Sequence, residues 1–199
     1  MTRKQTVIKI TLKGEVGWSK ALPKETGKYD EDKSNYSPTN VNFMPDGGFA
    51  IGDGHERHYL HRYDKDSKWV QSWGGFGDKP GKIKTPHDHW LDDRPGRKPT
   101  IAVCDRANAR LQYFSLEGKH LEFGDNLSFP ADMDIRGEVM LVPDLYAFRF
   151  SIKRTNSLNT LDTTPSEPSR CSQTNSPCAV NRQVETRSLY PSARCLLRS

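Results

Sequence analysis

The 199-residue chain is poor in apolar side chains: hydrophobic residues make up 34% of it, and no uninterrupted run of about 18 apolar residues occurs. The lack of such a run excludes a membrane-spanning helix. The apolar stretch at residues 7–12 is broken by Lys9 and is shorter than the core of a signal peptide, so we expect no export signal in this chain. The length favours one domain, with or without a tail.

Cysteine is equally scarce, with 4 residues in the chain. Cys104 stands alone in the body, and the other three lie beyond residue 170 at spacings that match no common zinc-binding pattern. A disulfide framework is therefore excluded as the basis of the fold. We predict that Cys104 is a small buried strand residue.

The formal net charge of +5 belongs mostly to the C-terminal end of the chain. Residues 1–149 hold 23 Lys and Arg against 22 Asp and Glu, whereas residues 150–199 hold 7 against 3. A nucleic-acid-binding domain would carry its basic side chains as a stripe on a folded face. We therefore predict no nucleic-acid partner.

The last fifty residues, 150–199, contain no Gly, His or Trp and are rich in Ser and Thr. This composition predicts disorder for residues 148–199, because such a segment buries too little apolar surface to offset the entropy of ordering it. Two hypotheses account for the change. One is a shift of the reading frame near residue 148, which the switch from Lys to Arg favours, and the other is a genuine disordered extension.

The body of the chain repeats itself, since residues 37–74 align with residues 85–124. Each unit opens with a proline and a short strand, followed by a turn and an apolar strand that ends in Asp. The unit then continues with an alternating strand and a polar turn, and it ends with a strand whose last residues are an aromatic residue and Gly. The predicted strands are residues 41–43, 49–53, 59–63 and a last strand ending at 74, then residues 89–91, 101–105, 110–114 and a last strand ending at 124. A third unit begins at residues 129–131 and extends to Asp144.

The opening prolines, Pro38, Pro86 and Pro130, are 48 and 44 residues apart. Four short strands in about 45 residues are typical of a β-propeller blade, whose sheet buries both faces against neighbouring blades. A β-sandwich with coincidental similarity is the alternative. We predict an all-β fold: a partial β-propeller of four-stranded blades in residues 37–147, preceded in residues 1–36 by a loop and the remnant of another blade.

The second unit resembles the NHL repeat, in which an Asp, an Asn and an Arg precede an aromatic strand. The matching residues here are Asp105, Asn108 and Arg110, followed by Tyr113 and Phe114. The resemblance covers roughly residues 37–146. It implies part of a six-bladed NHL propeller, similar to bacterial NHL-repeat proteins and more distantly to peptidyl-α-hydroxyglycine α-amidating lyases.

The resemblance to the lyases implies a zinc ion held by histidines that each follow the opening proline of alternating blades. That position is Thr39, His87 and Ala131 here, so His87 is the one ligand of this kind and the others would lie outside this chain. The lyase family also implies a catalytic Arg just after the strand-end Asp, which is Arg106. Its catalytic Tyr follows Asp-Gly in the preceding blade, where this chain has His55.

Residues two apart in extended chain point to the same face, so His89 is predicted to join His87 as a second metal ligand. Zinc needs three or four ligands, and the site is therefore incomplete in this chain. Alternatively, His87 satisfies a hydrogen bond at the strand end. Arg106 is expected either to hold an anionic group or to have a structural role, as the partner of Asp105 or as a bridge between blades.

Two function classes follow. The first is a binding scaffold without catalysis by itself, which takes a protein, peptide or glycan on the loops at residues 54–58 and 75–84. The alternative is a metal-dependent lyase, active only in an intact propeller, with Arg106 and His55 as catalytic residues. The remaining histidines of the first unit, His58 and His61, are expected to be solvated. Because an open propeller exposes blade edges, we also expect self-association.

Overall fold

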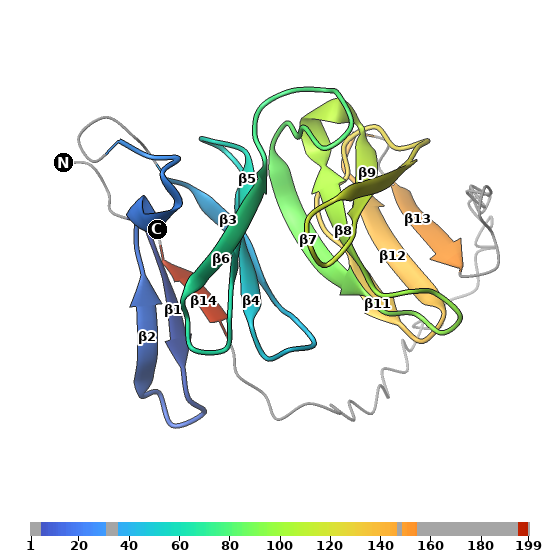
Figure 1. Cartoon of the computed structure of the whole chain (residues 1–199). Helices are drawn as coiled ribbons and strands as arrows, with labels where there is room; N and C mark the ends of the chain where they lie inside the picture. Colours follow the sequence, from blue (N-terminus) through green and yellow to red (C-terminus); the bar gives the residue numbers. More distant parts are fainter. Residues whose placement is uncertain (1–4, 31–35, 147–148, 155–194, 199) are drawn as a thin grey trace, which may run out of the picture.

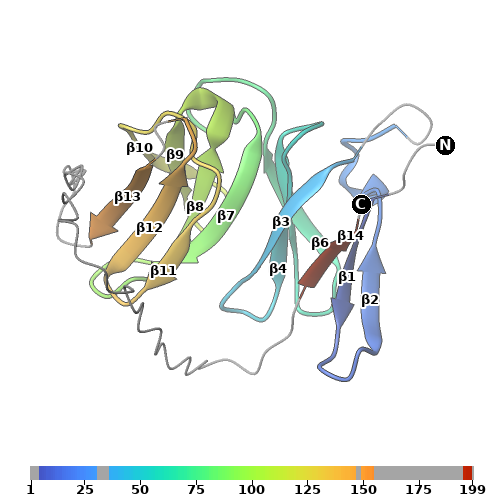
Figure 2. The same cartoon turned by 180° about the vertical axis from the view of Figure 1, so that it is seen from behind.

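The computed structural model describes residues 5–30, 36–146, 149–154 and 195–198. These residues form antiparallel sheets and two short 3-10 turns, which confirms the all-β prediction. No helix in the described part of the chain is long and apolar enough to cross a membrane. The sheets stand side by side, and their order along the chain is also their order in space (Figures 1 and 2).

The two repeat units predicted from the sequence form two four-stranded meanders. The first sheet contains β3 (Pro38–Phe43), β4 (Phe49–Asp53), β5 (Tyr59–Tyr63) and β6 (Trp69–Gly74). The second sheet contains β7 (Pro86–Asp92), β8 (Thr100–Asp105), β9 (Arg110–Phe114) and β10 (His120–Gly124). Three of the predicted strands, residues 49–53, 59–63 and 110–114, have the bounds that the sequence pattern indicated.

Two smaller sheets flank the meanders. The third sheet contains β11 (Asp134–Arg136), β12 (Val139–Asp144) and β13 (Arg149–Arg154). An N-terminal sheet contains β1 (Thr6–Ile10), β2 (Val16–Lys20) and β14 (Cys195–Arg198), with β1 in the middle. Within residues 1–36, expected to be a loop and the remnant of another blade, Trp18 lies in β2 and stacks on Phe49 with ring centroids 4.5 Å apart.

Two segments of residues 148–199, the range expected from composition to be disordered, are strands in the structure. Strand β13 pairs with β12 from Arg149 to Arg154, and β14 pairs with β1. Composition did not indicate these strands, because a sheet edge offers unpaired backbone N–H and C=O groups that a passing segment satisfies whatever its side chains are. The rest of residues 148–199 lies outside the described residues.

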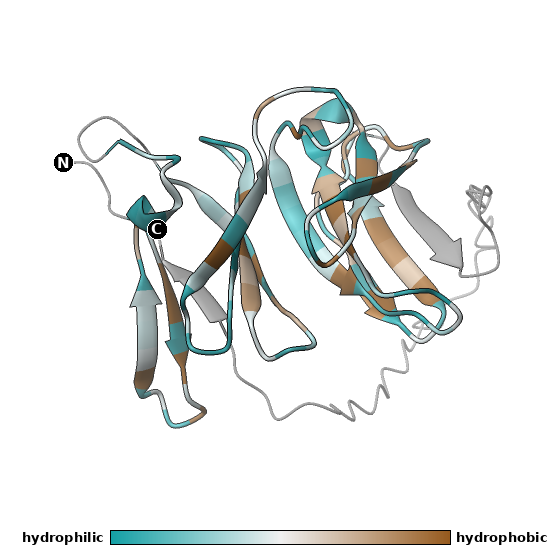
Figure 3. Ribbon diagram, in the orientation of Figure 1, coloured by the Kyte–Doolittle hydropathy of each residue, from teal (hydrophilic) through white to brown (hydrophobic). Residues whose placement is uncertain are grey.

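The central strands alternate between two apolar cores. In β8, Ile101 and Val103 face a core shared with the first sheet, whereas Ala102 and Cys104 face a core shared with the third sheet. All four are fully buried, as predicted for Cys104. Because successive side chains of a strand point to opposite faces, this sheet is covered on both sides, and apolar residues concentrate on strands such as β12 (Figure 3).

A buried aspartate ends the second strand of each unit, and we call Asp53, Asp105 and Asp144 the strand-end aspartates. Each accepts a hydrogen bond from a backbone N–H one or two residues before the opening proline of its own unit. The donors are Ser37, Lys84 and Ser128, at 3.2, 2.7 and 2.9 Å respectively. Buried carboxylates need such donors, because an unpaired charge is costly away from water. The three bonds hold the start and the end of neighbouring strands together.

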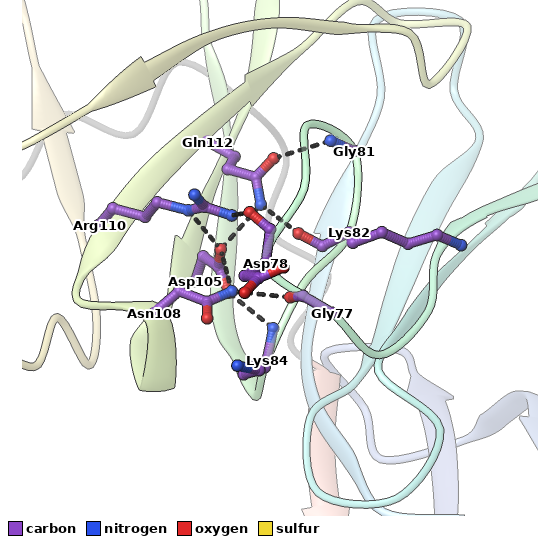
Figure 4. Close-up of polar contacts among 9 residues, drawn as sticks. All are labelled: Gly77, Asp78, Gly81, Lys82, Lys84, Asp105, Asn108, Arg110 and Gln112. Atoms are coloured by element: carbon purple, nitrogen blue, oxygen red, sulfur yellow. Dashed lines mark hydrogen bonds and ion pairs between the residues drawn. The ribbon is translucent and has the colours of Figure 1, made fainter.

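The carboxylate of Asp105 accepts hydrogen bonds from three side chains as well as from the backbone N–H of Lys84 (Figure 4). Asn108, Arg110 and Gln112 donate side-chain N–H groups to it at 2.8 to 2.9 Å. The same three side chains also bind carbonyl oxygens of the loop at residues 75–84, namely those of Gly77, Asp78 and Lys82. One aspartate therefore fastens this loop to the second sheet.

We expect Asp105→Asn to lower the free energy of unfolding by about 3 kcal/mol, because an amide leaves the Arg110 guanidinium without its buried anion. Asp66→Asn is the matched control, since Asp66 forms only an exposed ion pair with Lys65, and it is expected to change stability by less than about 1 kcal/mol. Urea unfolding of both variants measures the difference. Equal effects of the two substitutions would contradict the role given to Asp105.

Candidate functional site

Three of the four site residues predicted from the sequence come together. His55 lies in the turn after β4, Arg106 begins the 3-10 turn η2 (Arg106–Asn108), and His87 is the second residue of β7. The rings of His55 and His87 have centroids 5.9 Å apart and are nearly perpendicular. We call His55, His87 and Arg106 the basic cluster.

The strand-end geometry accounts for this meeting. The residue after each strand-end aspartate donates its backbone N–H to the carbonyl of the residue before the opening proline: Gly54 to Ser37 at 3.1 Å and Arg106 to Thr85 at 3.2 Å. The turn that follows the second strand is thereby held beside the beginning of the first strand. His87, one residue beyond Pro86, consequently lies next to Arg106.

The guanidinium of Arg106 forms no pair with Asp105, so that part of the structural alternative is wrong, whereas its contact with Phe129 of the third unit fits the expected bridge between units. Asp105 pairs instead with Arg110, whose Nε lies 2.8 Å from the carboxylate. The Cζ of Arg106 lies 4.8 Å from the ring centroid of Phe129, which in turn stacks on Tyr146 at 4.2 Å. Within the described residues, the buried Nε of Arg106 has no hydrogen-bond partner.

His87 is oriented by a backbone carbonyl. Its Nδ1 lies 2.5 Å from the oxygen of Ala131 and must donate, because a carbonyl only accepts. In the neutral ring, Nε2 then holds the lone pair and is the nitrogen available to a ligand. This bond is the strand-end hydrogen bond that the sequence left open as an alternative.

The imidazoles of the basic cluster are neutral at neutral pH. Burial lowers the pKa of His55, and the positive charge of Arg106 lowers it further. Burial and the same charge lower the pKa of His87, against the opposing effects of the Ala131 carbonyl and Asp132. Arg106 therefore carries the positive charge of the cluster.

The prediction that His89 shares a face with His87 is wrong. A register shift between Pro86 and His89 interrupts the alternation of β7, and it turns the two rings to different partners. His89 is almost completely buried, and its Nε2 lies 3.1 Å from the carbonyl oxygen of Ala50 in the first sheet. Burial lowers its pKa to about 4.

Within the described part of the chain, the residues around His87 do not form a complete zinc site. His87 has the carbonyl contact that commonly orients a metal-binding histidine. No group of three or more His, Cys, Asp or Glu side chains among the described residues is arranged to hold a metal ion. The expected second ligand, His89, is directed elsewhere.

Comparison with known proteins shows the fold alone. No family model matches the chain, and no curated protein matches it. The structure is similar to the crystal structure of a protein of unknown function from Bacteroides caccae, with a TM-score of 0.50 and 15% sequence identity. The similarity covers 78% of this chain and 55% of that one, so the chain spans little more than half the length of this neighbour.

A second polar group was missed by the sequence analysis. His61, expected to be solvated, is fully buried in β5 and contacts Tyr29 and Ser72. Tyr29 lies 32 residues before His61, in a loop whose polar composition hides its role. The alternation of β5 was a usable signal, because His61 lies two positions from both Tyr59 and Tyr63 and so shares a face with these aromatic side chains.

Asp88 is a buried acid in β7 that contacts the first sheet and the segment leading into the third sheet. It accepts hydrogen bonds from Asn40 in β3 and from the backbone N–H of Met133, the latter at 2.9 Å, and it lies beside Asp132. Burial, and then the neighbouring Asp132, raise the pKa of Asp88 to about 8. At neutral pH the carboxyl group therefore retains its proton.

A raised folded-state pKa makes stability fall as pH rises toward it. The unfolded chain releases the Asp88 proton near pH 4, so between that value and about 8 the folded state binds one more proton. We expect the free energy of unfolding to fall by up to about 1.4 kcal/mol per pH unit from pH 6.5 to 8, and Asp88→Asn to remove this slope. Urea unfolding at each pH measures it. Exposed Asp134→Asn is the control and should keep the slope; a flat wild-type profile would contradict the prediction.

Proposed function

We propose that this chain is part of an NHL-type β-propeller and acts as a binding scaffold, in which the basic cluster holds a carboxylate-bearing ligand. The propeller proposal is supported by two four-stranded meanders that pack face to face and by the third sheet that follows them. It is also supported by the equivalent backbone contacts at the three strand-end aspartates, which recur in each unit.

The ligand proposal rests on the unsatisfied guanidinium of Arg106. Its guanidinium has no carboxylate partner among the described residues, and its Nε is buried without a hydrogen bond. A polar group left in this state is costly, and a carboxylate supplies the anion whose geometry matches a guanidinium. The neutral rings of His55 and His87 stand beside it as further hydrogen-bonding groups.

The surroundings favour a ligand that also has an apolar part. Phe129 lies under the Arg106 guanidinium, and Tyr146, which is 69% exposed, stacks on Phe129. The neighbouring Leu145 is also exposed. A peptide with a free carboxylate next to an aromatic or aliphatic side chain satisfies both features, and this ligand falls within the protein or peptide partners expected from the sequence.

N-acetyl-phenylalanine and its uncharged amide are suitable probes, because they differ only in the carboxylate. We expect the acid to bind the wild-type chain and Arg106→Ala to weaken that binding by about tenfold or more, as for loss of a charged hydrogen bond. Titration followed by NMR measures the affinities. Arg136→Ala is the control, since Arg136 is an exposed arginine paired with Asp134.

Either of two results would overturn the ligand proposal. The first is equal binding of the acid and the amide, and the second is unchanged binding to the Arg106→Ala variant. Thermal unfolding of the variant separates a binding defect from a folding defect. The variant is expected to be destabilised by no more than about 1 kcal/mol, because Arg106 has no anion partner and loses only its contact with Phe129.

A metal-dependent lyase of the peptidyl-α-hydroxyglycine amidating type is the second candidate. The meeting of His55, His87 and Arg106 favours it, because these are the positions that the resemblance singles out. The described residues lack a complete set of metal ligands, so we expect this chain with added zinc to release no glyoxylate from a peptidyl-α-hydroxyglycine. Release that is abolished by His87→Ala would establish the lyase instead of the scaffold.

A further inference from the structure

The two most exposed Phe, Tyr or Trp side chains in the described part of the chain lie on either side of the basic cluster. Phe76, in the loop between β6 and β7, is 68% exposed, and Tyr146, just after β12, is 69% exposed. A single exposed apolar side chain is ordinary on a protein surface. Two that stand at the ends of one line of contacts, with a positive charge between them, form an extended surface.

Phe76 adjoins the basic cluster through His58 and Lys84. The centroid of its ring lies 5.2 Å from that of His58 and 5.5 Å from the ammonium nitrogen of Lys84. The backbone carbonyl of Lys84 accepts the N–H of Ala107 at 3.1 Å, and Ala107 directly follows Arg106. Lys84 therefore connects the ring of Phe76 to the turn that carries Arg106.

The other side of Arg106 is also apolar. Its guanidinium lies over Phe129, and Tyr146 stacks on Phe129. We call Phe76 the loop subsite and Phe129 with Tyr146 the third-unit subsite. Arg106 lies between the two subsites, since it contacts the second directly and reaches the first through Lys84.

The loop that carries Phe76 is firmly held. Three side chains bound to the Asp105 carboxylate also bind carbonyl oxygens of this loop (Figure 4). Gly75 donates its N–H to the carbonyl of His58 at 2.8 Å, and Ile83 donates its N–H to the carbonyl of Gly75 at 3.0 Å. An aromatic side chain on an ordered loop loses little conformational entropy when a partner covers it, which suits Phe76 to anchor a ligand.

The charge of this surface favours an acidic ligand. The loops at residues 54–58 and 75–84 hold four Lys and Arg residues against two Asp and Glu residues, and Arg106 adds a further positive charge. The Lys84 ammonium lies over the exposed Phe76 ring, so a positive charge accompanies the loop subsite as well. Acidic side chains are therefore attracted to the surface, and apolar side chains next to them find a ring on each side.

We propose that this surface binds an extended peptide segment in which an internal Asp or Glu lies between two aliphatic or aromatic residues. This rests on the proposed function and deepens it, because the carboxylate stays at Arg106 and Phe76 is added as a second apolar subsite. The acid is a side chain and not a C-terminus, because the segment continues on both sides of Arg106 to reach both subsites.

Acetylated and amidated peptides of the form Leu–spacer–Glu–spacer–Leu test this, because their only carboxylate is the Glu side chain. Spacers of one to three glycines vary the separation, since each extended residue adds about 3.3 Å. We expect the best peptide to bind the wild-type chain about tenfold more tightly than N-acetyl-phenylalanine. Phe76→Ala should remove that gain, through loss of a buried aromatic contact, and leave binding of N-acetyl-phenylalanine unchanged. Titration followed by NMR measures the affinities.

Phe43→Ala is the matched control. Phe43 is also an exposed phenylalanine with a lysine over its ring, since the Lys9 ammonium nitrogen lies 5.7 Å from the ring centroid. It lies at the far end of β3 from the opening proline Pro38, so peptide binding should be unchanged in this variant. Thermal unfolding of the Phe76→Ala variant, expected to be close to that of the wild type because the ring is largely exposed, shows that a binding defect is not a folding defect.

The outcomes separate the second subsite from the carboxylate site. Wild-type binding of the peptides by Phe76→Ala, with N-acetyl-phenylalanine still dependent on Arg106, would overturn the second subsite and leave the proposed function standing. The same holds if no peptide of the series binds more tightly than N-acetyl-phenylalanine. Equal binding of peptides with Glu and with Gln, together with loss of the Arg106 dependence of N-acetyl-phenylalanine, would overturn both.

Discussion

A buried carboxylate that accepts hydrogen bonds from backbone N–H groups holds the strand ends of each unit in place. At Asp53, Asp105 and Asp144, this interaction ties the end of the second strand to the segment that leads into the first. The strand ends could not be buried without it, because the backbone groups there have no partner in the sheet ladder. Every candidate site residue lies within a few positions of one of these ties.

Two arginines close to Asp105 in the sequence, Arg110 and Arg106, take different partners. Arg110 forms an ion pair with Asp105, and together with Asn108 and Gln112 it stabilises the loop at residues 75–84. Arg106 begins the turn just after the same aspartate but is directed toward Phe129 of the next unit. Because the aspartate is already saturated with donors, the second guanidinium is left beside His55 and His87.

Burial on both faces gives the polar residues of these sheets an unusual importance. A sheet covered on both sides has no solvated face, so Asp88, His89 and His61 are enclosed and must find partners in neighbouring segments. Each of them consequently links parts of the chain that are far apart in sequence. For the same reason the pKa of Asp88 is raised and the pKa values of His89 and His61 are lowered, because burial disfavours the charged form of each group. The polar groups inside the sheets thus join them, whereas those at the strand ends are the groups on which the proposed ligand site rests.

The sequence by itself determined the all-β class, the two meanders and several strand bounds, because alternation, turn residues and the recurring Asp are local features. The resemblance of the second unit to a known repeat also led to His55, His87 and Arg106 as candidate site residues, and strand alternation added His89 to them. Only the tertiary structure decided that Arg110 rather than Arg106 pairs with Asp105, that a register shift turns His89 away from His87, and that β14 pairs with β1. The physical reason is that these outcomes depend on competition among partners far apart in sequence, and only packing brings such partners within hydrogen-bond distance.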